Sequence, residues 1–168
     1  MVTKNDFTPA DWKTLRDTQY LVGFATLLAG SSGLATVKEM IALSLGIIEN
    51  QGSSIPLIRD LTSREEMEQA QASLKQSLGG AESTPTSERM RVRALEQTRL
   101  SLSLVGAKGS SEELDAFRRL LYGIAEKVAN AAREGGFLGF GGKQISDDER
   151  SFLDDLRNNL QLERVKRA

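Results

Sequence analysis

The chain has 168 residues, with 39% hydrophobic and 27% charged side chains and a formal net charge of −1. This composition is typical of one globular domain, and the near-neutral charge argues against a dedicated nucleic-acid binder. Cysteine and histidine are both absent, which excludes disulfides, thiol chemistry, Ser-His-Asp catalysis and the common zinc sites. Any catalysis would rest on carboxylates, lysines or hydroxyl groups.

The first predicted helix begins at Thr8-Pro9, because threonine is a good N-cap and proline suits the first turn. From Tyr20 to Leu28 its apolar residues face nearly every side, which predicts a helix at the centre of a bundle. No charge occurs from Thr18 to Val37, about the length of a membrane span. Glycines and serines at 30–33 interrupt this stretch, so we interpret it as a buried helical hairpin.

Apolar spacing predicts a second helix over residues 36–49 and a short helical turn over 56–61. A capping box, Ser63 to Glu66, begins the next helix, which ends at Gly79-Gly80. Residues 79–87 are predicted to form a mobile loop. The apolar face of the second helix consists of Val37, Ile41, Leu45 and Ile48.

Residues 88–105 contain an alternation, Leu100 to Leu104, that is also typical of a strand. No partner strand occurs elsewhere, and a lone strand cannot satisfy its backbone groups, so we predict a helix. Ser110 caps a long helix, Ser146 caps the last one, and the tail at 163–168 is predicted to fray. The sequence therefore predicts one all-α domain over residues 1–168, a compact bundle of five to seven helices.

The glycine-rich loop at 135–142 is the most unusual local sequence. Glycine loops can bring backbone N–H groups to a phosphate, but such loops follow a strand and this one follows a predicted helix. We expect its aromatic side chains to fold back onto the core, with a contact site as the functional alternative. The candidate binding residues are Gly135, Gly136, Phe137, Phe140 and Gly142.

Acidic residues gather where several helices begin. Such residues complement the positive end of a helix, so capping is the structural interpretation of Asp147, Asp148 and Glu149. The functional alternative is a hard cation held by carboxylate oxygens, although the spacing does not match an EF-hand loop. The candidate metal ligands are Glu39, Glu134, Asp147, Asp148 and Glu149.

Two segments, Ser32–Glu39 and Gly142–Glu149, share a glycine loop, an apolar residue and a Ser/Thr-x-x-Glu cap. This repeated pattern predicts a similar helical hairpin at each end of the chain, which would form a pseudo-repeat. It also resembles the TerB family of tellurite-resistance-associated helical proteins. That resemblance implies an all-helical fold, a bacterial-type stress response and acidic loop residues linked to metal binding. Ser32 replaces the aspartate expected in the first segment, and residues 137–141 interrupt the second.

We therefore expect a non-enzymatic helical module that acts through a protein partner, self-association or weak divalent-ion binding. No cofactor is required, although a divalent cation is a candidate, and no nucleic-acid partner is expected. The absence of an export signal and of cysteine predicts a cytoplasmic location. A membrane-associated protein is the second hypothesis, and a carboxylate-based enzyme around residues 135–142 is the third.

Overall fold

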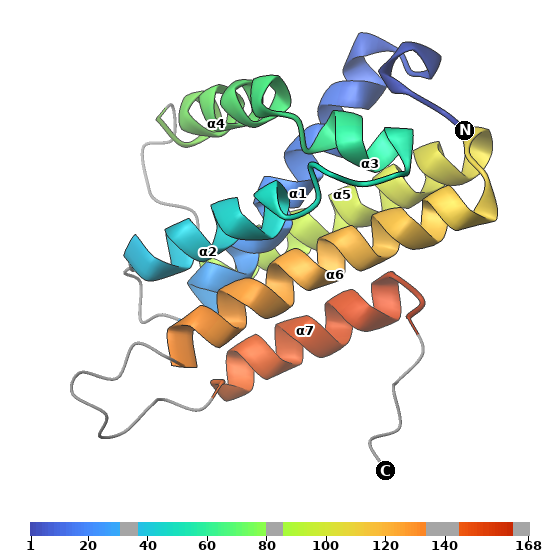
Figure 1. Ribbon diagram of the computed structural model, residues 1–168. Coiled ribbons are helices and arrows are strands. Elements are labelled where there is room, and N and C mark those ends of the chain that lie inside the picture. The colour runs from blue at the N-terminus through green and yellow to red at the C-terminus, as the bar shows by residue number, and fades with distance from the viewer. Residues whose placement is uncertain (31–36, 80–85, 134–144, 163–168) are drawn as a thin grey trace.

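Seven α-helices and one short 3-10 helix make up the part of the chain that the structure describes (Figure 1). The structure is a computed structural model, and it describes residues 1–30, 37–79, 86–133 and 145–162. No strand occurs in these ranges, so the all-α prediction is confirmed. The 3-10 helix is Lys4–Asp6, and the α-helices are α1 Pro9–Gly30, α2 Val37–Ile48, α3 Pro56–Leu61, α4 Arg64–Gly79, α5 Ser87–Lys108, α6 Ser111–Arg133 and α7 Asp147–Asn159.

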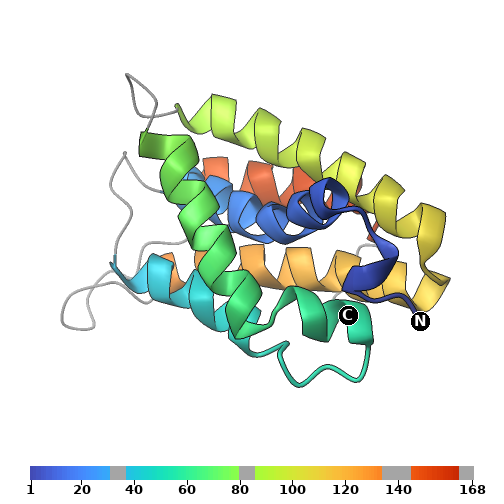
Figure 2. The same ribbon diagram turned by 90° about the horizontal axis from the view of Figure 1, so that it is seen from above.

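Helix α1 is the central element of the bundle. It runs between α5 on one side and α6 with α2 on the other, and it also contacts α4 and α7 (Figures 1 and 2). Almost every side chain from Thr18 to Leu27 is buried, as the uncharged sequence predicts. The buried hydroxyl groups of Thr18 and Thr26 donate to carbonyl oxygens four residues earlier, at 2.7 and 2.9 Å. These two hydroxyl groups are thus satisfied within the helix, whereas Gln19 Oε1 is buried without a hydrogen-bond partner among the described residues.

The ambiguous segment at 88–105 forms most of α5, so the helix prediction is confirmed. Its inward side carries small residues that let α5 lie close to α1. Ser101 is fully buried, and its hydroxyl lies 2.8 Å from that of Thr18. Leu100, on the other side, is 53% exposed. The strand-like alternation therefore has no structural counterpart.

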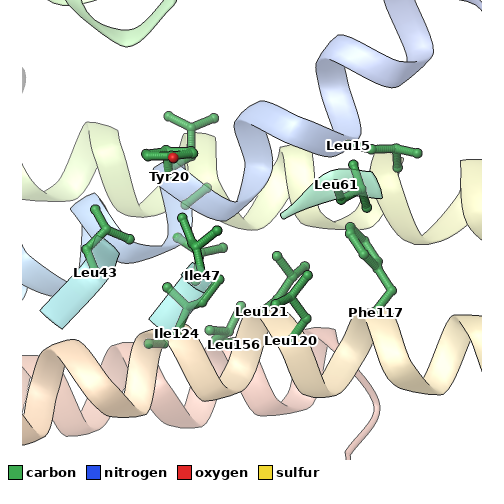
Figure 3. Close-up of a cluster of buried hydrophobic side chains, with 14 of the residues drawn as sticks. Leu15, Tyr20, Leu43, Ile47, Leu61, Phe117, Leu120, Leu121, Ile124 and Leu156 are labelled. Atoms are coloured by element: carbon green, nitrogen blue, oxygen red, sulfur yellow. The ribbon is translucent and has the colours of Figure 1, made fainter. Parts of the chain in front are cut away.

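A second layer of apolar side chains joins α6 to the rest of the bundle. The regular spacing along α6 buries Phe117, Leu121 and Ile124 completely, and α7 adds Phe152 and Leu156. Figure 3 shows labelled side chains of α1, α2, α3, α6 and α7 meeting in one interior. The predicted helices that follow Ser110 and Ser146 are confirmed as α6 and α7.

The described residues do not show the predicted pseudo-repeat. Helix α2 packs mainly along α6, whereas α7 contacts α1, α5 and α6. The two segments that suggested the repeat lie partly at 31–36 and 134–144, outside the described residues, as do positions 80–85 of the predicted loop and the tail at 163–168.

Two glycines bring α2 close to its neighbours. A Cβ atom at Gly23 of α1 would lie 2.2 Å from Cδ1 of Leu43, and one at Gly46 of α2 would lie 3.3 Å from the Ile124 Cα. Helix axes can approach this closely only where a side chain is missing. The side of α2 that carries Gly46 is therefore the side that docks on the bundle.

We predict that Gly23→Ala destabilises the fold by about 1–3 kcal/mol, because the added methyl group overpacks the buried Leu43. Gly123→Ala is the matched control, since Gly123 is an exposed position of α6 with no atom near the added methyl. The control should stabilise the fold by about 0.5–1 kcal/mol, through helix propensity alone. Urea unfolding followed by circular dichroism measures both, and equal stabilisation by both variants would contradict the close α1–α2 contact.

Candidate functional site

The residues predicted as metal ligands do not form a cluster among those that the structure describes. Glu39 and Glu149 are buried, at 4% and 3% exposure. Asp147 and Asp148 are exposed, and Asp147 forms an ion pair with Arg150. Within the described ranges, no three acidic side chains are placed to hold a metal ion. Glu134 and the candidate binding loop of Gly135, Gly136, Phe137, Phe140 and Gly142 lie outside these ranges.

Glu149 closes the capping box that begins α7. The Ser146 backbone N–H and hydroxyl donate to Glu149 Oε2 at 2.8 and 2.9 Å, and the Glu149 N–H donates back to Ser146 Oγ at 3.2 Å. Its other oxygen lies against the end of α1, because a Cβ at Gly30 would be 2.1 Å from Oε1. Both carboxylate oxygens are therefore used in building the fold, which supports the capping interpretation.

Glu113 forms the same box with Ser110 at the start of α6, with the same three distances. Its second oxygen accepts a hydrogen bond from the backbone N–H of Val2 at 2.5 Å. Burial alone would raise the pKa of Glu113, but the hydrogen bonds from Ser110 and Val2 outweigh burial and lower it. The sequence predicted the box, whereas the contact with Val2, 111 residues away, had no local signal.

The third box, at the start of α4, uses its glutamate differently. The Glu66 N–H donates to Ser63 Oγ at 3.4 Å, but the carboxylate turns away from its own cap. Its oxygens instead lie 2.6 Å from Lys4 Nζ and 3.6 Å from an Arg16 nitrogen. Since Glu66 and Arg16 are both buried, this pair fixes α4 against α1.

The charged network continues from Arg16 along α1. Arg16 Nε pairs with Asp17 at 2.8 Å, and the other Asp17 oxygen contacts Lys13 at 2.5 Å and Ser73 of α4 at 2.8 Å. Tyr20 lies nearby, where burial raises the pKa of its hydroxyl to about 12. Each carboxylate of the network thus contacts two cationic groups, and Arg16 is shared between Glu66 and Asp17.

A cleft of about 110 Å³ lies beside this network, between α1, α4 and α5. It has room for a few waters at about 30 Å³ each, well below the roughly 300 Å³ of a typical ligand pocket. A shallower depression of about 520 Å³ lies between α5 and α7. Among the described residues, one carboxylate lines each of them, Asp17 and Asp155 respectively. Neither therefore offers a pair of carboxylates for acid–base catalysis.

The most distinctive surface is on α2. Four large apolar side chains point outward there, with Met40 44%, Ile41 53%, Leu45 44% and Ile48 43% exposed. We call these four residues the α2 apolar face. The opposite side of the helix is buried and consists of Ala42, Leu43, Gly46 and Ile47. Four large side chains of this short helix are thus about half exposed, while two others, Leu43 and Ile47, are buried.

The predicted apolar face that contains Ile41, Leu45 and Ile48 thus lies at the surface and not in the core. Helix α2 is apolar nearly all round after Glu39, so two opposite faces satisfy the helical period. Gly46 decides between them, because only its side allows the backbone of α6 to approach. The Val37 side chain lies outside those that the structure describes.

Elsewhere among the described residues beyond position 1, large exposed apolar side chains are isolated. Val92 and Leu100 are exposed on α5, eight residues apart, and the charged Glu96 lies between them in the sequence. Single exposed apolar residues are ordinary, whereas a contiguous patch marks a contact surface. The α2 apolar face is therefore the candidate functional site.

In the described ranges, every helix falls short of the length or apolar character needed to cross a bilayer. Comparison with protein-family models, with curated proteins and with solved structures finds no match for this chain. The resemblance to the TerB family stays a prediction.

We predict that Glu113→Gln lowers the free energy of unfolding at pH 7 by about 1.5–3 kcal/mol, the range for hydrogen bonds to a charged group. Because folding lowers the pKa of Glu113, its contribution is present above the usual value of 4.5 and is lost as the pH falls through the folded pKa. The difference in unfolding free energy between wild type and variant should therefore disappear at low pH. Urea unfolding at pH 7 and at pH 3 measures it, and a gap independent of pH would refute this role.

Proposed function

We propose that this protein is a non-enzymatic helical module that binds a protein partner through the α2 apolar face. One observation carries the proposal: a helix that is apolar nearly all round lies at the surface with four large apolar side chains about half exposed. Helices of this composition are normally covered on all sides. We expect a binding partner to bury the exposed side of α2.

The energetics support this interpretation. Full burial of an aliphatic side chain is worth about 1.5–3 kcal/mol, so covering a half-exposed one gains roughly 1 kcal/mol. The face includes Ile41, Leu45 and Ile48, spaced four and three residues apart on the outer side. This spacing matches the way one helix presents anchors to a groove or to another helix. Covering several such anchors together favours contact with a partner.

The remaining features favour structural roles. The buried glutamates Glu66, Glu113 and Glu149 are engaged by caps or cations. The buried Trp12, Phe117 and Phe152 belong to the core. Contact between proteins is thus the activity that the described residues support best. The cytoplasmic location and the stress-response role remain part of the proposal, resting on composition and on the TerB resemblance.

We predict that a photoreactive benzoylphenylalanine at position 45 forms a discrete covalent adduct with the partner in native cell extract. The same probe at position 100 is the control, because Leu100 is similarly exposed, at 53% against 44%, but isolated on α5. Adduct formation from position 45 should fall at least tenfold when Ile41→Glu places a charge in the face. Denaturing electrophoresis and mass spectrometry identify the adduct.

Circular dichroism first establishes that each variant keeps its helical content. Equal labelling from positions 45 and 100, or labelling unaffected by Ile41→Glu, would show that the α2 apolar face is not a specific contact surface.

A further inference from the structure

We infer that the partner on the α2 apolar face is a second copy of this chain, with the two α2 helices packed antiparallel across a two-fold axis. This inference rests on the proposed function and names its occupant. The axis passes between Ser44 and Leu45, at the middle of the face.

Between residues 41 and 48 the face is symmetric in its isoleucines about that point, whereas Met40 lies opposite Glu49 of the partner subunit. Ile41 and Ile48 lie equally far from it, so Ile41 of one chain packs against Ile48 of the other. At the centre, the large Leu45 meets the partner's Ser44, whose hydroxyl is already satisfied by the Met40 carbonyl at 3.3 Å. Large side chains therefore pack against small ones, as interdigitating helices require. A two-fold contact needs such a self-complementary surface.

Charge favours the antiparallel direction. The positions from Met40 to Ile48 carry no ionisable side chain, and the first charge after them is Glu49, which pairs with Lys127 of α6. Two parallel helices would bring the two Glu49 carboxylates together. Antiparallel packing instead places each Glu49 beside the first turn of the other helix, where the helix dipole is positive.

The size of the face sets the strength of the dimer. A stable interface buries about 800 Å² on each partner, and four half-exposed aliphatic side chains supply only part of that area. We therefore expect a weak dimer that forms and dissociates with protein concentration.

The absence of cysteine makes the geometry testable, since one introduced cysteine can form a disulfide only between chains. Ser44→Cys lies at the axis and should link to itself on mild oxidation. Two copies of position 41 lie about 10 Å apart along the helices, at 1.5 Å per residue, beyond the roughly 7 Å Cα separation that a disulfide tolerates. A mixture of Ile41→Cys, carrying a size tag, with Ile48→Cys should therefore give mostly the mixed dimer.

Two controls accompany the experiment. Ser103→Cys, on the exposed side of α5, should remain largely unlinked. Leu45→Glu added to the Ser44→Cys chain should reduce linking at least tenfold, while Leu100→Glu leaves it unchanged. Sedimentation of the unmodified protein should show a mass that rises with concentration, and Leu45→Glu should keep it monomeric.

The outcomes separate the two proposals. Self-linking of Ile41→Cys and of Ile48→Cys in preference to the mixed product would overturn the antiparallel arrangement. A monomer at every concentration with no linking at position 44 would overturn self-association. In that case, an adduct of position 45 with a different polypeptide would leave the proposed function standing, and the lack of any adduct would end both.

Discussion

From Thr18 to Leu27, helix α1 has almost no side chain that faces water, and the arrangement of the other helices follows from covering it. A central helix of this kind must satisfy its polar groups internally, which the hydroxyls of Thr18 and Thr26 do by bonding to its own carbonyls. The amide of Gln19 reaches the carbonyl of Leu61 at the end of α3, at 3.1 Å. These bonds allow an apolar environment on every side. Helices α4, α5, α6 and α7 then provide that environment together with part of α2.

Much of the fold could be predicted from the sequence, because helix starts are local signals. Three helices begin just after a serine that precedes a glutamate by three residues: Ser63, Ser110 and Ser146. The reciprocal hydrogen bonds of a capping box form at the starts of α6 and α7, whereas at α4 only the glutamate N–H bonds to its serine. What local patterns could not predict was where the glutamates send their remaining oxygen atoms. Glu113 reaches Val2, and Glu66 turns to Lys4 and Arg16. These partners depend on the three-dimensional arrangement alone.

The candidate site was harder to predict for a different reason. Periodicity identifies an apolar face only when the opposite face is polar, and α2 has no polar face after its first turn. The choice between its two faces depends on the single missing side chain at Gly46 and on its fit to Ile124. The acidic residues drew attention because they are charged and clustered, yet Glu149 proved to be part of a cap. The signal that could have identified the surface is an excess of large aliphatic residues over the number that one buried face needs.

The one-sided docking of α2 also sets how firmly that helix is held. Its inner face has only two large apolar residues, Leu43 and Ile47, beside the small Ala42 and Gly46, so its opening exposes less apolar surface than the opening of α1 or α6 would. Local opening free energy follows the apolar contact that is lost, which makes α2 an easily released unit. A partner bound to the outer face raises this opening free energy, so partner binding and the stability of α2 are thermodynamically linked. Amide hydrogen exchange along α2 would then slow selectively on complex formation, while the exchange of α1 stays unchanged.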